Sequence, residues 1–503
     1  METEIEIKFF FNADFSDKLL QEITQHKVIS HKDQMLYNTY FDTADRALRK
    51  MDMGLRIRRI EDQYTQTIKT SGRVIGGLHQ RPEYNEIVVG MEPQLIKFKR
   101  EIWPEDCDLV TLQEQLTPLF STHFRRLHWL LEMQEGTLIE VAYDCGQIIA
   151  GQRESTICEI ELELIKGDEA QLFVLAEKIA HLPHVRLGNI SKAQRGYMLT
   201  ENSHFLVKSI EFSKLNTKMT LQQALLTNFQ HGLKHLQYHE NSYIEQGDIQ
   251  ALIQLQKSIM FLHQNIHLFR QAGVSFNGCR WIADLQWLAR SFSWIDEKCV
   301  LQNLLENKAY YLRKLPKLKQ LKKNISLAEQ ALPNQEDIVN LLNSTRYCQF
   351  ILRLTEWLIT FEKMPQTDNV THSLVTFAKA ILTESWAKLT LPLTSAGTLA
   401  LENLLPHQGT LVANLMTGLS LGTLFDSKKC AEYRYPWLDI YQGLLELSML
   451  NTVYELALDE EDSDIQHEYL KWVKRKQNSL LNAIEQSKQR ALKNEMYWID
   501  LEH

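Results

Sequence analysis

The hydrophobic periodicity of the chain changes once, near residue 202, and this change divides the expected fold into two parts. Before it, apolar residues alternate with polar or charged ones, as in a β-strand with two different faces. The alternating runs are 4–10, 54–60, 64–70, 84–89, 123–131, 137–143 and 157–165. After it, helical spacing dominates in 220–240, 250–272, 336–361, 371–389, 436–458 and 466–495. We therefore expect an α+β protein, strand-rich first and all-helical second.

The expected domains are residues 1–201 and 218–503, joined by a linker at 202–217 that mixes both textures. A chain of 503 residues is too long for a single hydrophobic core. Two helical patterns, 16–25 and 169–181, interrupt the strands, and the glycine-containing loop 70–77 predicts a hairpin connection. The recurring helical hairpins of the second part predict a helical bundle.

Composition and charge exclude several classes of protein. The first 205 residues carry 24 Lys and Arg against 32 Asp and Glu, and the remainder carries 31 against 31, so neither part has the basic excess of a nucleic-acid binder. No run of about 18 apolar residues predicts a membrane span, and the start METEIEIKFF lacks the layout of a secretion signal. We expect a cytoplasmic protein. Its seven cysteines lack a Cys-x-x-Cys pair, so we expect them to be reduced and mostly buried.

Charged side chains share one face of the predicted strands. Side chains two positions apart lie on the same face, so Glu4, Glu6 and Lys8 lie together. The same division recurs in 55–58, 67–69 and 159–164. In any one strand, such charges could simply face solvent while the apolar side packs on a core. A closed barrel with a polar, water-filled bore and an apolar outer side covered by helices would use both faces of every strand.

The charged faces supply acids and bases together. The acids are Glu4, Glu6, Asp144, Glu159, Glu161 and Glu163, and the bases are Lys8, Arg56, Arg58, Lys69 and Arg126. Clustered carboxylates repel one another unless a cation lies among them, and oxygen ligands suit Mg²⁺ or Mn²⁺. Clustered Arg and Lys require an anion, and the Arg fork fits phosphate oxygens. A metal and a polyanion together indicate phosphoryl chemistry.

Nine short motifs follow one another along the first 200 residues. They are Glu4-x-Glu6-x-Lys8, Tyr40-Phe41-Asp42-Thr43, Leu55-Arg56-x-Arg58, Lys69, Arg81-x-Glu83, Arg126-x-x-Trp129, Asp144-x-Gly146, Glu159-x-Glu161-x-Glu163 and Ser191-Lys192-x-x-Arg195-Gly196-Tyr197. In this order they resemble the CYTH family, the triphosphate tunnel metalloenzymes. The resemblance implies an eight-stranded antiparallel tunnel that holds a triphosphate with divalent metal, Mg²⁺ or Mn²⁺.

The resemblance also implies roles for the matching residues. Glu4, Glu6 and Lys8 are the expected catalytic residues. The implied metal ligands are Glu4, Glu6, Asp144, Glu159, Glu161 and Glu163, the last of which adds negative charge near the others. The implied substrate-binding residues are Lys8, Arg56, Arg58, Lys69, Arg81, Arg126 and Lys192. Glu83 could orient a base or contact metal, and both options remain open. Three histidines are interpreted as surface or packing residues: His79, His123 and His128.

The expected activity is metal-dependent hydrolysis of inorganic tripolyphosphate to pyrophosphate and phosphate, which needs no protein nucleophile. Thiamine triphosphatase, nucleoside or RNA triphosphatase and adenylate cyclase are alternatives on the same fold. Each would need a pocket for an organic group. An alternative of another class is a polyphosphate-binding scaffold without turnover. The many metal-type carboxylates argue against a scaffold.

The helical part resembles another family through three motifs. They are Leu415-Met416-Thr417-Gly418-x3-Gly422-x2-Phe425-Asp426, Pro436-Trp437-Leu438 and Gly443-x2-Glu446-Leu447. They resemble the CHAD domain, a helical module associated with polyphosphate binding, which makes longer polyphosphate a candidate partner. The stretch 252–257 lacks the His and Arg of the usual basic stripe, and the basic residues at 313–323 are typical of a solvated face. A structural or partner-docking role is at least as well supported.

Overall fold

The computed structural model describes residues 2–306, 312, 315–365, 373–395, 405–458 and 462–499. The chain divides into two compact units. The first comprises Met1–Leu206 and Val339–Ile359, and the second comprises Val207–Ile338 and Thr360–His503. Among the described helices, none is both long enough and apolar enough to cross a membrane.

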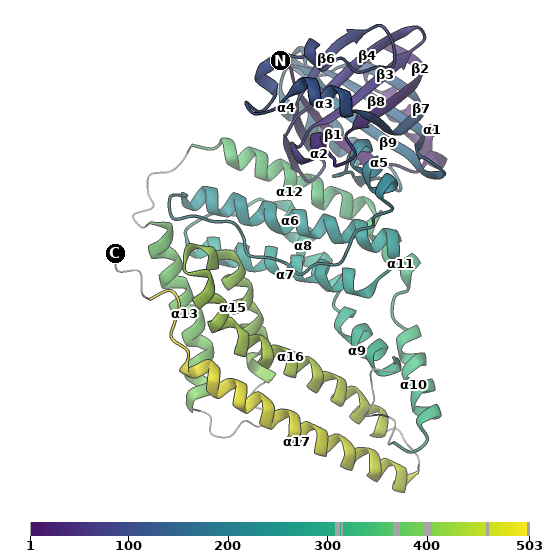
Figure 1. Cartoon of the computed structure of the whole chain (residues 1–503). Helices are drawn as coiled ribbons and strands as arrows, with labels where there is room; N and C mark the ends of the chain where they lie inside the picture. The colour runs from purple at the N-terminus through teal and green to yellow at the C-terminus, as the bar shows by residue number, and fades with distance from the viewer. Residues whose placement is uncertain are drawn as a thin grey trace. The chain divides into compact units, whose positions relative to one another are not determined.

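Eight antiparallel strands of the first unit close into a barrel (Figure 1). Their order is β1-β9-β8-β7-β2-β3-β4-β6, and pairing of β6 with β1 completes the ring. The strands are β1 (Glu2–Phe10), β2 (Lys27–Asp42), β3 (Gly54–Ile60), β4 (Gln63–Lys69), β6 (Leu78–Val88), β7 (Thr117–Glu132), β8 (Leu138–Ala150) and β9 (Arg153–Lys166). Two short strands, β5 (Arg73–Ile75) and β10 (Arg186–Leu187), pair with β6 and β1. The predicted closed antiparallel barrel is confirmed.

The barrel strands have an apolar face that is turned away from the charged side chains. On β1, Ile7 and Phe9 are fully buried on the face opposite Glu6 and Lys8. The helix α4 (Glu169–Ile179) contacts β9. The helix α5 (Lys192–Glu201) contacts β7, β8 and β9 from the inner side, where Tyr197 packs on Phe120 and both Tyr197 and Lys192 line the cavity. The remaining α-helices of residues 2–206 are α1 (Ser16–Ile23), α2 (Ala47–Lys50) and α3 (Leu109–Gln115). In the second segment of the unit, Arg353 donates to Glu177 of α4 at 2.6 Å.

The sequence patterns located most strands but missed β2. This strand has 16 residues, and its first seven are exposed, so apolar alternation is present only near its end. It is held by backbone pairing to β3 and β7 on its two sides. Pairing to neighbours, which single-strand periodicity does not report, therefore extends this strand into the exposed part of the barrel.

The described part of the second unit is helical. Its α-helices are α6 (Leu221–Gln246), α7 (Ile249–Gln271), α8 (Arg280–Ser291), α9 (Ile295–Leu305), α10 (Leu318–Gln330), α13 (Leu374–Ser395), α15 (Gln408–Leu421), α16 (Ser427–Leu458) and α17 (Ser463–Lys493). The predicted helix 336–361 is two helices, α11 (Gln335–Leu342) and α12 (Thr345–Lys363), which straddle the boundaries of the units. The helix predicted to start at Pro436 begins at Ser427 and contains that proline.

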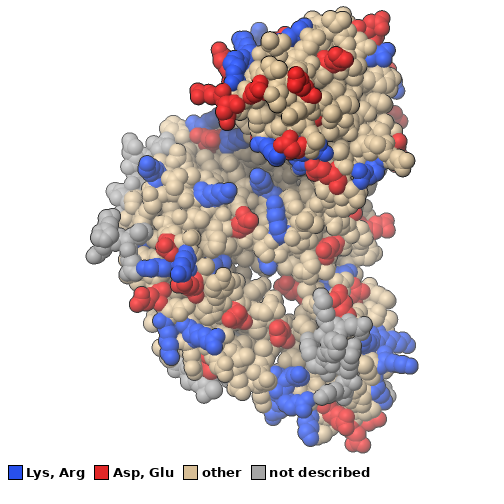
Figure 2. All heavy atoms as spheres, in the orientation of Figure 1, with Lys and Arg blue, Asp and Glu red and all other residues tan. Residues whose placement is uncertain are grey.

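In the helical part, the stretch 252–257 and the described basic residues of 313–323 mostly contact other residues of the same domain. In the stretch 252–257, Leu252 and Leu255 are fully buried in α7. In the basic cluster, Lys317 pairs with Asp462 at 3.6 Å and Lys322 donates to the carbonyl of Leu305 at 3.4 Å. Arg313 and Lys314 lie outside the described residues. Figure 2 shows Lys and Arg interspersed with Asp and Glu on the face drawn, in keeping with the neutral charge balance of this part of the chain.

Candidate functional site

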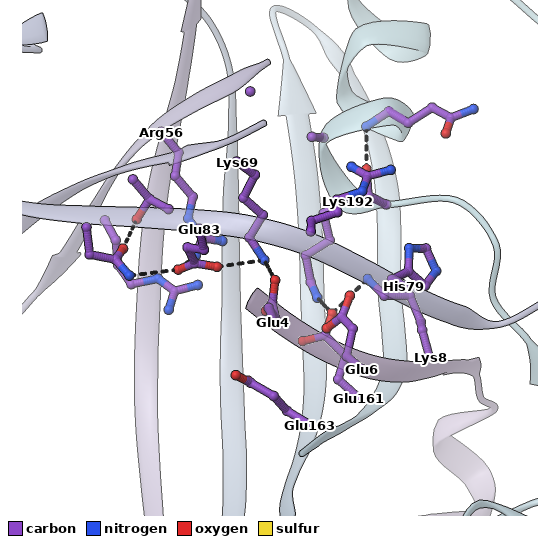
Figure 3. Close-up of a pocket in the computed structure, with 18 of the residues that line it drawn as sticks. Glu4, Glu6, Lys8, Arg56, Lys69, His79, Glu83, Glu161, Glu163 and Lys192 are labelled. Atoms are coloured by element: carbon purple, nitrogen blue, oxygen red, sulfur yellow. Dashed lines mark hydrogen bonds and ion pairs between the residues drawn. The ribbon is translucent and has the colours of Figure 1, made fainter. Parts of the chain in front are cut away.

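The barrel contains a cavity of about 530 Å³ whose lining is dominated by charged side chains (Figure 3). All seven residues predicted to bind phosphate line it: Lys8, Arg56, Arg58, Lys69, Arg81, Arg126 and Lys192. Four of the six predicted metal ligands line it as well: Glu4, Glu6, Glu161 and Glu163. The other two, Asp144 and Glu159, are fully buried and lie outside the lining. The charged strand faces therefore meet inside the barrel.

At one side of the cavity, two lysines are embedded in carboxylates. Lys192 contacts Asp144 at 2.7 Å, Glu161 at 3.0 Å and also Glu159. Lys8 contacts Glu161 at 2.7 Å and Glu159 at 3.2 Å. Burial opposes the charged form of Lys8, but Glu159 and Glu161 outweigh it and hold its pKa well above the usual value. Both lysines therefore enter the cavity as full positive charges.

Arg126 completes this group from β7. Its Nε and Nη2 atoms each contact one oxygen of Asp144 at 2.7 Å, and Nη2 also contacts Glu161 at 2.7 Å. Asp144 is opposite both Arg126 and Glu159 in the strand register, which explains the meeting of these side chains. Burial disfavours the Asp144 carboxylate, yet Arg126 and Lys192 keep its pKa below the usual value. Acids and bases here neutralise one another, and we call this set (Lys8, Arg126, Asp144, Glu159, Glu161 and Lys192) the balanced group.

A second set of acids has too little positive charge around it. Glu163 lies across from Glu6 of β1 and from Glu140 of β8 in the strand register. Burial, followed by repulsion from Glu4, Glu6 and Glu140, raises the pKa of Glu163 to about 8, because Lys69 offsets only part of these effects. We call Glu4, Glu6, Glu140 and Glu163 the acidic group. Its excess negative charge would be relieved by a bound cation.

Arg58 presents the opposite imbalance. It is half-buried in the cavity wall, its Nε donates to Asn38 at 2.8 Å, and among the described residues it has no ion-pair partner. Burial, together with the nearby cations Arg56 and Arg126, lowers its pKa to about 9. The buried Nε atoms of Arg56 and Arg81 also have no hydrogen-bond partner in the described structure. An anion in the cavity would relieve this excess of positive charge.

Glu83 links the two imbalances. It contacts Lys69 at 2.9 Å and lies 3.8 Å from Arg56, while Lys69 also contacts Glu4. Burial opposes ionisation of Glu83, but Lys69 and Arg56 lower its pKa to about 2. Of the two roles left open by the sequence, this arrangement favours the orientation of bases.

The donor chemistry at the site fits a hard divalent cation. One oxygen from each of Asp144, Glu159 and Glu161 lies within 4.8 Å of the others, but lysine and arginine already occupy these carboxylates. Glu4, Glu6 and Glu163 line the cavity with less compensation. Carboxylate oxygens suit Mg²⁺ and Mn²⁺, so the acidic group is the better candidate for a cation.

Two known domains match the two halves of the chain. Residues 2–197 match the CYTH domain, and residues 227–477 match the CHAD domain. The chain therefore contains a CYTH domain followed by a CHAD domain. Both expected resemblances are confirmed.

Individual relatives match parts of the chain. A Haemophilus influenzae protein named inorganic triphosphatase is 41% identical over 197 residues, which is 39% of this chain and 54% of that protein. The match therefore spans about half the length of this relative. A Hippeastrum adenylyl cyclase structure described as having a dominant triphosphatase activity is 20% identical, with a TM-score of 0.30, and covers 40% of this chain and 96% of its own. The CHAD domain from Ricinus communis is 16% identical, with a TM-score of 0.44, and the match covers 57% of this chain and 96% of that domain.

The sequence did not predict every residue that lines the CYTH cavity. His79 lines the cavity, its Nε2 lies 2.9 Å from the Gly188 carbonyl, and burial lowers its pKa to about 4, so it is a neutral part of the wall. Glu140 also lines the cavity. Glu140 is four positions before Asp144 on the same strand, so the two side chains share a face, and this spacing could have predicted its place in the lining. His123 lies outside the lining and packs on Tyr37.

Proposed function

We propose that the CYTH domain hydrolyses inorganic tripolyphosphate to pyrophosphate and phosphate with the help of Mg²⁺ or Mn²⁺. The observation that carries this proposal is the coexistence, in one cavity, of incompletely compensated acids around Glu163 and of Arg58, a base without an ion pair among the described residues. One imbalance calls for a cation and the other for an anion. A polyanionic phosphate chain with a divalent cation satisfies both. The similarity to the Haemophilus influenzae inorganic triphosphatase supports the choice of substrate.

The basic residues bind and orient the phosphate chain. Arg56, Arg58 and Arg81 offer guanidinium donors, and Arg58 has no competing carboxylate among the described residues. Lys8 and Lys192 stay charged because the carboxylates beside them favour the ammonium form. Fixed positive charge around the equatorial oxygens stabilises the charge that develops as the terminal phosphoryl group departs.

The acidic group would hold the divalent cation. Glu4 and Glu6 on β1 and Glu163 on β9 are its predicted ligands, with Glu140 adding negative charge. When bound, such a cation supplies neutralisation of phosphate charge and activation of water. Asp144, Glu159 and Glu161 remain predicted ligands from the family resemblance. In the structure, they position Lys8, Arg126 and Lys192.

The decisive experiment measures phosphate release by the full-length protein from tripolyphosphate, ATP and thiamine triphosphate. Each substrate is tested with Mg²⁺, with Mn²⁺ and with EDTA. We expect tripolyphosphate to yield equal amounts of pyrophosphate and phosphate with metal, and nothing above background with EDTA. Absence of metal-dependent release from all three substrates would overturn the proposal. Faster turnover of an organic triphosphate would transfer the function to that substrate.

Binding of longer polyphosphate by the CHAD domain stays a prediction from the resemblance. The stretch 252–257 is largely buried in packing, and Lys317 and Lys322 have partners within the domain. We therefore place the proposed activity in the CYTH domain alone.

A further inference from the structure

Two cysteines lie on the outer wall of the barrel, directly behind the balanced group. Cys145 on β8 and Cys158 on β9 are opposite each other in the strand register. The adjacent pair, Asp144 and Glu159, is opposite as well. Successive side chains of a strand point to opposite faces. The two thiols therefore share the outer face at the position where the two carboxylates share the inner one.

The backbone pairing brings the thiols close together. The carbonyl of Cys158 accepts a hydrogen bond from the Phe11 N–H, beyond the end of β1, at 3.1 Å. The N–H and C=O of one strand residue point to the same side, so the polar backbone of Cys158 faces β1 and turns away from β8. Cys145 and Cys158 thus form a non-hydrogen-bonded antiparallel pair, in which Cα atoms are about 4.5 Å apart and side chains approach most closely.

This separation permits a disulfide but does not fit it ideally. Disulfides occur at Cα separations of about 4.4–6.8 Å and prefer about 5.5–6 Å. A bond between Cys145 and Cys158 therefore forms without rearrangement of the fold and pushes β8 and β9 apart by about 1 Å locally. A strained, accessible disulfide is also readily reduced, as reversible modification requires.

The surroundings assign different roles to the two thiols. Cys145 is exposed, contrary to the expectation of mostly buried cysteines, whereas Cys158 is half-buried. The Sγ of Cys158 lies 3.8 Å from the Tyr143 hydroxyl, which is on the same outer face. An oxidant from solvent reaches Cys145 first, and Cys158 is the neighbouring thiol that can resolve the oxidised sulfur.

We propose that Cys145 and Cys158 are a redox modification site, in which a peroxide forms a reversible cross-strand disulfide that slows the reaction in the cavity. The Cys145 sulfur attacks one peroxide oxygen and breaks the O–O bond, giving a sulfenic acid and water from hydrogen peroxide. The Cys158 sulfur then attacks the sulfenic sulfur. The S–S bond forms, the S–O bond breaks, and the hydroxyl leaves as water with the remaining thiol proton.

The coupling to turnover rests on the proposed function. Asp144 and Glu159 position Lys192 from two different strands, and Glu159 also holds Lys8. Widening the strand spacing behind them displaces these lysines relative to the phosphate chain. Because a misplacement of about 1 Å can lower the rate roughly 100-fold, we expect oxidation to lower kcat at least about threefold.

Peptide mapping tests the bond without any substrate. Trypsin cuts after Arg126, Arg153 and Lys166, so Cys145 and Cys158 fall in separate peptides, 127–153 and 154–166. After treatment of the reduced full-length protein with hydrogen peroxide in EDTA, we expect these peptides to be joined, and dithiothreitol to separate them. The joined peptide should be lost in Cys145→Ser and Cys158→Ser and retained in Cys107→Ser, which removes a half-buried thiol elsewhere in the domain.

Phosphate release from tripolyphosphate with Mg²⁺ tests the consequence, after removal of peroxide and EDTA. Oxidised wild type should be slower and recover fully with dithiothreitol, while Cys145→Ser and Cys158→Ser should keep the reduced rate after the same treatment. Failure to join the peptides would overturn the modification site. Joined peptides with unchanged turnover would overturn its coupling to the cavity. A reduced enzyme without any metal-dependent turnover would overturn the proposed function and leave the peptide result standing.

Discussion

The CYTH and CHAD parts both bury polar groups, but they differ in what those groups contact. In the CHAD part, His235 contacts Ser258 at 2.7 Å and Asn265 donates to Ser420 at 2.9 Å. A buried group there that lacks a hydrogen bond, the amide of Asn228, is uncharged. In the CYTH barrel, Arg58 and Glu163 are charged or titrating groups whose surroundings oppose their charge. Charge that its surroundings oppose is costly, so its presence around a cavity indicates ligands.

The same contrast exists on a smaller scale within the barrel. In the balanced group, each carboxylate has a cation at ion-pair distance, and truncation should mainly affect structure. In the acidic group, the charges repel one another in the free protein, and truncation should mainly affect function.

The largest effect is expected for Glu6→Gln in the acidic group. The amide keeps the shape of the side chain but removes the negative charge, so the cation and the transition-state charge it stabilises are lost. By analogy with loss of one electrostatic element in other enzymes, kcat for tripolyphosphate should fall by about 10²–10³. Steady-state phosphate release at saturating Mg²⁺ measures the change.

The matched control for this variant is Glu154→Gln. Glu154 is exposed and belongs to β9, so it removes the same charge from the barrel without touching the cavity. It should retain the wild-type rate. Near-normal turnover in Glu6→Gln, or an equal loss in both variants, would contradict the assignment of the acidic group.

Asp144→Asn in the balanced group should instead destabilise the fold. It removes the negative charge of a fully buried carboxylate that contacts Arg126 and Lys192 at 2.7 Å. Breaking such a buried pair costs about 3 kcal/mol, because the remaining charges are left uncompensated. Urea unfolding should therefore show a lower midpoint. Asp33→Asn is the control, since Asp33 pairs with Arg125 in an exposed position and should leave the midpoint nearly unchanged.

Glu6 and Asp144 also illustrate which features of the site the sequence predicts and which it does not. Alternation in Glu4-x-Glu6-x-Lys8 predicts a shared face from local geometry alone, and the structure places all three side chains in the cavity lining. The division between paired and unpaired acids depends on cross-strand register, such as Asp144 opposite Arg126 and Glu163 opposite Glu6. Register is set by closure of the barrel, so no single strand contains it.

Secondary structure followed the same rule. The strand predicted at 54–60 coincides with β3, where apolar and charged residues alternate throughout. The strand β2 was missed because its first seven residues are exposed and show no apolar alternation, although they pair with β7. In the CHAD part, the pattern at 336–361 spans two helices, because a break at 343–344 leaves the apolar spacing readable on both sides. Local apolar patterns indicate which residues are buried. They do not predict the limits of an element where strand pairing or a break in a helix sets those limits.

On the CHAD side of the comparison, His235 should make stability fall at acid pH. Burial, followed by the neighbouring His239, lowers the pKa of His235 to about 3, whereas the unfolded side chain titrates near 6.5. Its contribution is therefore complete above pH 6.5 and is lost as pH falls toward 3, because the unfolded chain takes up the proton first. Between pH 7 and pH 5 the loss amounts to about 2 kcal/mol.

Unfolding free energies of His235→Gln across this range measure the effect. The variant should have a flatter pH dependence than wild type, since glutamine keeps hydrogen-bonding capacity without titrating. His467→Gln, at an exposed position of α17, should leave the pH profile unchanged. Parallel profiles for wild type and His235→Gln would show that this buried histidine does not couple folding to pH.

The smallest change in stability is expected for Arg58→Met. A gain in stability would distinguish this CYTH residue from the buried polar groups of the CHAD part. Removing a half-buried cation that lacks an ion pair among the described residues, beside Arg56 and Arg126, should stabilise the free protein by about 1 kcal/mol. The same change removes an anion donor, so tripolyphosphate should raise the melting temperature of the variant less than that of wild type. Differential scanning fluorimetry with and without tripolyphosphate measures both shifts. A less stable variant that still gains the full shift from tripolyphosphate would mean that Arg58, like the buried polar groups of the CHAD domain, serves the fold.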